Sequence, residues 1–354
     1  MDFGIMFFSS SEDSLSGNIY DLIKKSAIYG DKNNFSSVWI PERHFTEFGG
    51  IYSNPAIVHA ALAGITNKIR LNSGSVVMAL HDPIRVAEEW AMVDNLSNGR
   101  VGLSVASGWN PNDFAFFPEN YKNKHKVMYE GITVVKKLWR GESIERLSGN
   151  GKKVPIRIYP SIVQKEIPFY ITVSGNSDGF KNAGKLGFNI LTSLLDQTVE
   201  DLAEKIKIYR KARSENGFDP QTGKVSLMLH TFIGPDDVTI KEEARVPYCN
   251  FLKRNKKIFE GMAYNRGSDF SLNDLSEEDL DEFLDFLYER FANTKGLIGS
   301  PESCIDMVRK TKEAGVDEIA CLLDFGPKSD RILENLKYLN ELKKSCMDLV
   351  VLSH

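Results

Sequence analysis

Residues 71–106 read LNSGSVVMALHDPIRVAEEWAMVDNLSNGRVGLSVA and contain one complete strand–helix–strand unit. The two ends of this segment, Leu71–Val77 and Val101–Ala106, are short and apolar, which predicts buried strands. Pro83 opens a helical pattern that stops at Gly99. The expected buried side of this helix carries Trp90, Val93 and Leu96. A strand, a helix and a second strand in this order indicate parallel strands joined by a crossover helix.

The same alternation continues in both directions along the chain. Further strands are expected at Asp2–Phe8, Ser36–Ile40, Phe169–Val173, Asn189–Ser193, Val225–Phe232 and Glu318–Leu323. A helical pattern follows each of the eight strands, the last one at Lys328–Lys343. Eight such units predict an α/β protein with a single (β/α)8 TIM barrel, with insertions after strand four and before strand eight. An open doubly wound sheet is the alternative, although no G-x-G-x-x-G follows the first strand.

Two further features concern the organisation of the chain. Residues 141–151 are rich in Gly and Lys and predict a surface excursion, which can form a hairpin with Val154–Tyr159. No repeat or low-complexity linker divides the sequence, so one barrel domain is assigned to residues 1–345 and a C-terminal tail to residues 346–354.

Composition narrows the class of protein. The 354 residues include 44 Lys and Arg against 48 Asp and Glu, a net charge of −4, with no basic block. This balance argues against a nucleic-acid or membrane-surface partner, and no apolar run reaches the roughly 18–20 residues of a membrane span. The first residues lack a secretory signal. The scattered cysteines are Cys249, Cys304, Cys321 and Cys346, which indicates reduced thiols in a cytoplasmic enzyme.

Barrel enzymes carry their chemistry on the loops that follow the strands. After the second strand, Glu42-Arg43-His44 places three ionisable side chains in a row, either as catalytic groups or as a solvated loop or structural ion pair. After the fifth strand, Ser174-Gly175-Asn176-Ser177 precedes a helix, whose N-terminal N–H groups attract an anion such as phosphate. Helix capping by Ser177 or Asp178 is the alternative explanation.

Other residues in these loops have both a functional and a structural interpretation. The aromatic cluster of Trp109, Phe114, Phe116 and Phe117 suits a flat ring system or the packing of a loop. His44 has no second His or Cys at ligand spacing, so no metal site is expected. His81-Asp82-Pro83 is interpreted as a loop and a helix N-cap rather than a catalytic pair. A serine hydrolase is disfavoured because G-x-S-x-G does not occur at a strand end.

Several motifs go beyond these general patterns. The most specific is residues 38–49, VWIPERHFTEFG, followed by Asn54-Pro55. Supporting motifs are LNSGS at 71–75, HDPIRVAEE at 81–89, DNLSNGR at 94–100 and GSPESC at 299–304. Together they resemble the bacterial luciferase-like flavin-dependent monooxygenases, from residue 1 to about residue 340. The segments 107–111, 173–176 and 317–321 are most similar to the branch found in polyketide and nonribosomal-peptide biosynthesis.

This resemblance implies an activity. Members of the family bind reduced FMN, which a separate NAD(P)H-dependent flavin reductase supplies, and O2 adds to the flavin C4a. The resulting peroxide hydroxylates the substrate or inserts oxygen beside a carbonyl in a Baeyer–Villiger reaction. The implied substrate is a polyketide or peptide intermediate, as a small molecule or bound to a carrier protein, and the implied assembly is a homodimer. The alternatives are an F420- or flavin-dependent hydride-transfer enzyme and a non-catalytic flavin-binding partner subunit.

The resemblance also implies site residues. Those expected around the flavin are Ser75, Val76, Val77, Ala106, Ser107, Gly108, Trp109, Asn110 and His125, with Ser174, Gly175, Asn176 and Ser177 on its phosphate. A non-proline cis peptide is expected at Val76-Val77, under the flavin ring.

Family positions also suggest roles for the loop after the second strand. Arg43 stands where the luciferase α subunit has a catalytic histidine, and His44 matches a second histidine. Arg43 would stabilise the peroxide anion and His44 would act as acid, base or hydrogen-bond donor beside Glu42. Ser107 replaces the arginine that contacts the phosphate, so His125 or Arg43 would supply that charge. Residues 255–290 are interpreted as a lid or a surface insertion.

Overall fold

The computed structural model describes residues 1–8, 18, 20–47, 49–159, 161–254 and 276–351. Its parallel strands are β1 (Asp2–Met6), β2 (Ser37–Ile40), β3 (Arg70–Val77), β4 (Val101–Ala106), β7 (Phe169–Thr172), β8 (Asn189–Ser193), β9 (Val225–Ile233) and β11 (Glu318–Leu322). They pair in the order β11-β1-β2-β3-β4-β7-β8-β9, and β9 pairs with β11 to close the sheet. The predicted eight-stranded (β/α)8 barrel is therefore confirmed.

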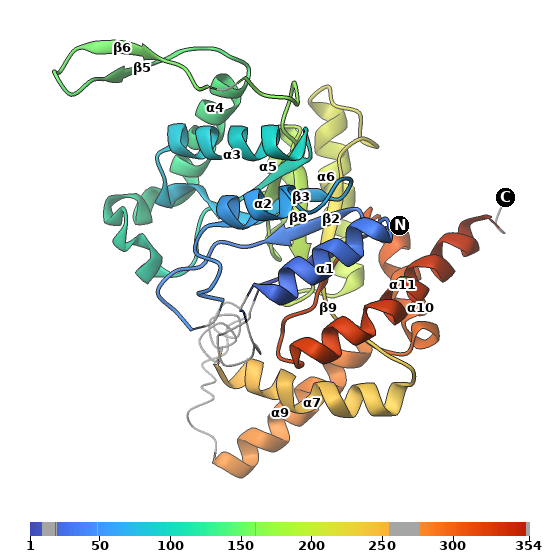
Figure 1. The fold of residues 1–354 in the computed structure, drawn as a ribbon. Helices are drawn as coiled ribbons and strands as arrows, with labels where there is room; N and C mark the ends of the chain where they lie inside the picture. Colours follow the sequence, from blue (N-terminus) through green and yellow to red (C-terminus); the bar gives the residue numbers. More distant parts are fainter. Residues whose placement is uncertain (9–17, 19, 48, 160, 255–275, 352–354) are drawn as a thin grey trace.

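Helices surround this barrel, as Figure 1 shows. They are α1 (Asp21–Lys32), α2 (Pro55–Ala63), α3 (Pro83–Ser97), α4 (Lys124–Trp139), α5 (Ser177–Lys185), α6 (Val199–Glu215), α10 (Pro301–Glu313) and α11 (Ser329–Val351). The C-terminal tail expected from residue 346 begins inside α11, which continues to Val351. In the described part of the chain, no helix is both long and apolar enough to cross a membrane.

Local sequence signals explain where the helices begin and end. The Asp82 side chain accepts a hydrogen bond from the Ile84 N–H, and Pro83 occupies the first helical position. Ser300 caps α10 in the same way, accepting from the Ser303 N–H. These caps satisfy N–H groups that have no partner inside the helix.

One face of α3 differs from the expectation. Trp90 and Val93 are buried, but Leu96 is 59% exposed. Each step of three residues rotates the side chain by about 300°, so positions 90, 93 and 96 drift around the helix instead of sharing one face. Leu96 therefore points away from the barrel.

Two insertions interrupt the simple alternation. After β4 come the short helices η3 (Pro111–Ala115) and η4 (Pro118–Asn123), and then, beyond α4, the hairpin of β5 (Ile144–Leu147) and β6 (Lys153–Ile156). The hairpin was predicted, and it projects from the barrel in Figure 1. A further short helix, η2 (Met78–Leu80), lies between β3 and α3.

The second insertion lies between β9 and β11. It contains α7 (Asp237–Arg254), α9 (Glu277–Thr294) and a short strand, β10 (Gly296–Gly299), which pairs with β9. This ninth strand was not expected in a segment that reads as charged and poor in strands. Most of the possible lid, residues 255–275, lies outside the described residues, and the remainder belongs mainly to α9.

The barrel interior is filled by alternate strand residues. Met6, Trp39, Tyr170, Leu191, Met228, Ala320 and Leu322 form this inner cluster, while their strand neighbours pack outward against the helices. At the N-terminal end of the strands, the buried Glu318 carboxylate accepts hydrogen bonds from Ser37 and Ser226. The inner cluster thus lies between this polar layer and the opposite end of the barrel, where the candidate site opens.

Candidate functional site

A cavity of about 320 Å³ opens at the C-terminal end of the barrel strands. Its walls come from the ends of several neighbouring strands, and its floor is the apolar side of the inner cluster, including Met6, Leu191 and Met228. Ligand pockets typically have about 300–1,000 Å³ and this mixture of apolar walls and a few polar groups. The position also matches the face that carries the active site in barrel enzymes.

The cavity collects many of the predicted residues. Those that line it are Glu42, Arg43, Ser75, Val77, Ala106, Ser107, Gly108, Trp109 and Ser174. The predicted residues that are not among its lining residues are His44, Val76, Asn110, His125, Gly175, Asn176 and Ser177. The roles assigned to both groups stay predictions.

Secondary structure explains several of these placements. Val76 is buried on the opposite side of β3 from the cavity, because successive strand residues point to opposite faces. His125 is exposed on the first turn of α4. Asn110 caps η3, and its amide also donates to Asp113 Oδ1 over 2.7 Å.

The cis peptide is displaced from its expected place. It joins Gly74 to Ser75, whereas the Val76-Val77 bond is trans, so that expectation is wrong by two residues. The pairing of β3 with β4 shifts register between Ser73 and Val76, and motif position alone did not reveal this irregularity. The hydroxyl of Ser75 lies 3.1 Å from that of Ser104 and also contacts that of Thr172, which forms a polar cluster at the cavity wall.

Gly108 lines the cavity in a left-handed backbone conformation. Its φ is +86°, and a Cβ there would lie 2.9 Å from Val77 Cγ1 and 2.9 Å from the Phe114 ring. Only glycine combines this backbone conformation with such close packing. The cavity combines apolar walls such as Val77 and Ala106 with the hydroxyl groups of Ser75 and Thr172, so the residues present fit a flat heteroaromatic ring with polar edges.

Glu42 is a buried carboxylate that lines the cavity. Its Oε1 lies 2.8 Å from His44 Nε2 and 2.6 Å from His81 Nε2, and its Oε2 accepts from the Val77 N–H over 2.7 Å. Burial alone would raise the pKa of Glu42, but the hydrogen bonds from His44, His81 and Val77 lower it below its usual value. The side chain is therefore ionised at neutral pH and acts only as an acceptor.

His81 is the residue that sequence reasoning missed. Burial would lower the pKa of His81, yet the bond to Glu42 and the charges of Glu42 and Glu89 raise it. Asp82 does cap α3 as expected, but the preceding histidine turns toward the loop after β2. The available signal was topological, because β2 and β3 are neighbours and both residues follow the C-terminal ends of these strands.

Arg43 places a buried positive charge at the cavity wall. Its guanidinium carbon lies 4.0 Å from the centre of the Phe8 ring and 5.4 Å from that of Trp109. Burial lowers the pKa of Arg43 to about 10, although the charges of Asp113 and Asp324 act in the opposite direction. The group stays a cation at neutral pH and can stabilise negative charge in the cavity.

In the predicted phosphate loop, some of the backbone N–H groups already donate hydrogen bonds to protein side chains. The side chain of Asn176, rather than of Ser177 or Asp178, caps α5 and accepts from the Asp178 N–H. The Gly175 N–H donates to Asp196 Oδ2 over 3.0 Å. A phosphate at Ser174 would therefore meet the N-terminus of a helix that also has a carboxylate beside it.

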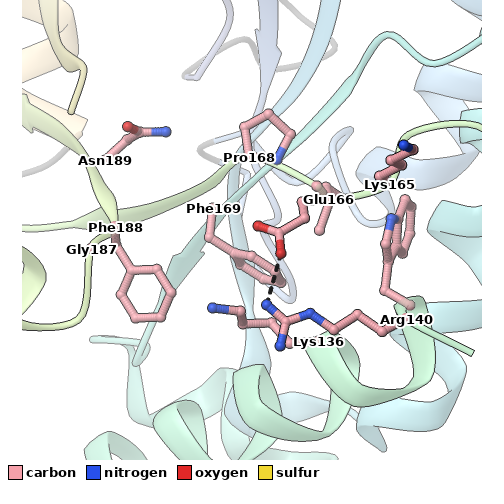
Figure 2. A pocket seen from close by; sticks show the side chains of 11 residues that line it. Lys136, Arg140, Lys165, Glu166, Pro168, Phe169, Gly187, Phe188 and Asn189 are labelled. Carbon is pink, nitrogen blue, oxygen red and sulfur yellow. Dashed lines mark hydrogen bonds and ion pairs between the residues drawn. The ribbon is translucent and has the colours of Figure 1, made fainter. Parts of the chain in front are cut away.

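A second cavity, of about 250 Å³, lies at the opposite end of the strands, where β7 and β8 begin (Figure 2). Lys136 and Arg140 enter it from the last turn of α4, and Arg140 forms an ion pair with Glu166 over 2.8 Å. Cations at this position complement the negative end of the helix dipole. Their placement has a structural explanation, so the first cavity is the candidate active site.

Comparison with known proteins agrees with this geometry. The family model for luciferase-like monooxygenases matches residues 1–318. The alkanal monooxygenase alpha chain of Photorhabdus luminescens is 24% identical over 328 residues, covering 89% of this chain and 88% of the relative. The oxygenase component of the flavin-dependent trigonelline monooxygenase of Acinetobacter baylyi is 24% identical over 342 residues, covering 94% and 91%.

Solved structures share the fold. The monooxygenase RslO1 from Streptomyces bottropensis has a TM-score of 0.77 at 20% identity, covering 96% of this chain and 98% of that chain. The oxygenating constituent of 3,6-diketocamphane monooxygenase from Pseudomonas putida, in complex with FMN, gives 0.75 at 19% identity and 96% of both chains. An F420-dependent secondary alcohol dehydrogenase gives 0.70 at 18% identity, covering 98% and 99%. With the family model covering most of its length, this chain belongs to the luciferase-like monooxygenase family of flavin-dependent enzymes.

Proposed function

We propose that this protein is the oxygenase of a two-component system that binds reduced FMN from a separate flavin reductase and uses O2. The substrate is a polyketide or nonribosomal-peptide intermediate, as a small molecule or as an acyl or peptidyl group on a carrier protein. The reaction is a hydroxylation or a Baeyer–Villiger insertion. Reduced FMN, O2 and the substrate give FMN, water and a product with one added oxygen atom.

The buried guanidinium of Arg43 at the cavity wall is the observation that carries this proposal. Reduced FMN supplies two electrons for the activation of O2, and negative charge then develops on oxygen. Arg43, which is itself buried beside the rings of Phe8 and Trp109, meets that charge at the cavity wall. The hydroxyl groups of Ser75 and Thr172 offer hydrogen bonds to a polar ring edge.

The partners are supported by less direct observations. The trigonelline relative is named an oxygenase component, which supports a separate reductase, and the diketocamphane structure contains FMN. The substrate class rests on the resemblance of residues 107–111, 173–176 and 317–321 to the natural-product branch. For a homodimer, Ile57 on α2 and Met92 and Leu96 on α3 are exposed on neighbouring helices, and exposed apolar patches mark contact surfaces.

Hydride transfer is the second candidate function. The F420-dependent alcohol dehydrogenase shares this fold, so the barrel itself does not separate the two chemistries. An enzyme of that kind would turn over with F420 and would not need O2. A non-catalytic flavin-binding subunit would bind flavin without turnover.

Anaerobic titration with photoreduced FMN, followed by rapid mixing with O2, tests the proposal. The expected result is tight binding and an O2-dependent absorbance transient that outlives the oxidation of free reduced FMN and differs from the spectrum of oxidised FMN. Reoxidation at the rate of free flavin would contradict an oxygenase. In that case turnover with F420 under anaerobic conditions would favour hydride transfer.

A further inference from the structure

Two histidines share one oxygen of a buried carboxylate, an arrangement that the loop after β2 alone does not provide. Glu42 Oε1 lies 2.8 Å from His44 Nε2 and 2.6 Å from His81 Nε2. The Glu42 side chain is 1% exposed, whereas that of His81 is 27% exposed. His81 therefore connects the buried Glu42 carboxylate to the more exposed edge of the site.

We infer that His81 is a positioning residue. Its hydrogen bond to Glu42 keeps this carboxylate ionised, so that the hydrogen of His44 stays on Nε2 and His44 Nδ1 carries no hydrogen. The inference rests on the proposed function, in which His44 is the predicted acid or base, and it defines which nitrogen of His44 can accept a proton. It uses no contact between His81 and flavin or substrate.

The electrostatics of the cluster support this role. An ionised carboxylate cannot donate, so both imidazoles must donate their Nε2–H to Oε1. A carboxylate buried this deeply needs such donors to remain ionised. Asp113 from η3 and Glu89 from α3 add negative charge around the cluster, and Arg43 adds positive charge beside it.

Removing the His81 donor is expected to move the hydrogen of His44 from Nε2 to Nδ1. In His81→Leu, Glu42 keeps the bonds from His44 and Val77 but loses its shortest one. The loss of this bond raises the pKa of Glu42, which favours the protonated carboxyl group, and that group donates its hydrogen to His44 Nε2. The hydrogen of neutral His44 consequently sits on Nδ1. In His81→Gln, the side-chain amide can still donate to Oε1, so the original tautomer is retained.

Nitrogen-15 NMR of the imidazole rings in the ligand-free protein tests this without any turnover. The chain has six histidines, and the disappearance of one signal in His44→Asn assigns His44. We expect neutral His44 to carry its hydrogen on Nε2 in the wild type and in His81→Gln, and on Nδ1 in His81→Leu. Nδ1–H in the wild type, or Nε2–H in a folded His81→Leu protein, would overturn the inference. Should the leucine variant fail to fold, His81→Asn, too short to reach Oε1, replaces it with the same expectation.

Product formation provides the second measurement. With saturating reduced FMN, His81→Leu is expected to lower kcat about tenfold with little change in KM, and His81→Gln to restore most of it. Equal losses in both variants with equal stability would contradict a positioning role. If neither the wild type nor any variant forms product, the proposed function fails. The NMR measurement of the His44 tautomer still decides the role of His81 in that case.

Discussion

The guanidinium carbon of Arg43 lies 4.0 Å from the centre of the Phe8 ring, so a cation–π contact packs the loop after β2 against a residue two positions beyond the end of β1. This contact fixes a charge that a flexible side chain would otherwise carry into solvent. The site thus holds a cation where the cavity is lined by aromatic and hydroxyl groups.

Replacing this cation tests its role. Arg43→Met keeps much of the apolar stem but removes the charge, and we expect the oxygenation rate to fall about 100-fold, as when one charge-stabilising donor is removed. Binding of reduced FMN should change far less. Stopped-flow mixing with O2 and product analysis measure the two effects. Unchanged product formation would contradict the assignment of Arg43.

Gly108 offers a test of the cavity shape. In Gly108→Ala, the new Cβ would lie 2.9 Å from Val77 and from Phe114, so we expect the Kd for reduced FMN to rise about tenfold or more, or about 1.4 kcal/mol. Gly141→Ala is a matched control, since Gly141 has a φ of +77° with nothing within 4 Å of its Cβ. Backbone strain costs each variant about 1 kcal/mol of stability, and the close contacts of the new Cβ add to this cost only in Gly108→Ala. Only Gly108→Ala should bind reduced FMN more weakly. Similar affinities in the two proteins would exclude a steric role for Gly108.

Asp196 tests the phosphate loop. Its carboxylate accepts from the Gly175 N–H, so Asp196→Asn removes a negative charge beside the expected phosphate. We expect FMN to bind about tenfold more tightly, a gain of about 1.4 kcal/mol, while riboflavin, which lacks the phosphate, binds as before. Fluorescence titration with both flavins measures this difference. A parallel change for both ligands would place the phosphate elsewhere.

His230 predicts an acid-dependent loss of stability. The rings of Tyr248, Phe251, Phe291 and Phe325 surround it, and burial lowers the pKa of His230 to about 3. In the unfolded chain its pKa is near 6.5, so below pH 6.5 the unfolded state binds the extra proton and is favoured. At pH 5 this costs about 2 kcal/mol of unfolding free energy relative to pH 7.

Denaturant unfolding of His230→Phe measures this contribution. The variant should lose about 2 kcal/mol less than the wild type between pH 7 and pH 5. His125→Gln, at an exposed position of α4, is the control and should follow the wild type. If the unfolding free energy of His230→Phe fell as much as that of the wild type between pH 7 and pH 5, His230 would not be the group that takes up a proton on unfolding.

The barrel was predictable because its strands are short, apolar and regularly separated by helices with clear caps such as Asp82 and Ser300. β10 was not, because four residues that begin and end with glycine give no periodicity that distinguishes a strand from a loop. Glu42 and Arg43 could be proposed from their place after β2. The pairing of Glu42 with His81, 39 residues later, depends on the alignment of β2 with β3 and on the turn at η2. Neither of these can be predicted from the local sequence.

The pairing of β9 has a consequence for the entrance of the cavity. β9 pairs with β8 as far as Met228 and with β11 as far as His230, and its last residues, to Ile233, continue along β10. Three further residues extend a strand by about 10 Å. The rim of the barrel is therefore uneven: a two-stranded wall stands on the β9 side, and loops and short helices follow β2, β3 and β4 across from it. A bulky molecule that enters the cavity would therefore pass between a hydrogen-bonded pair of strands on one side and loops and short helices on the other.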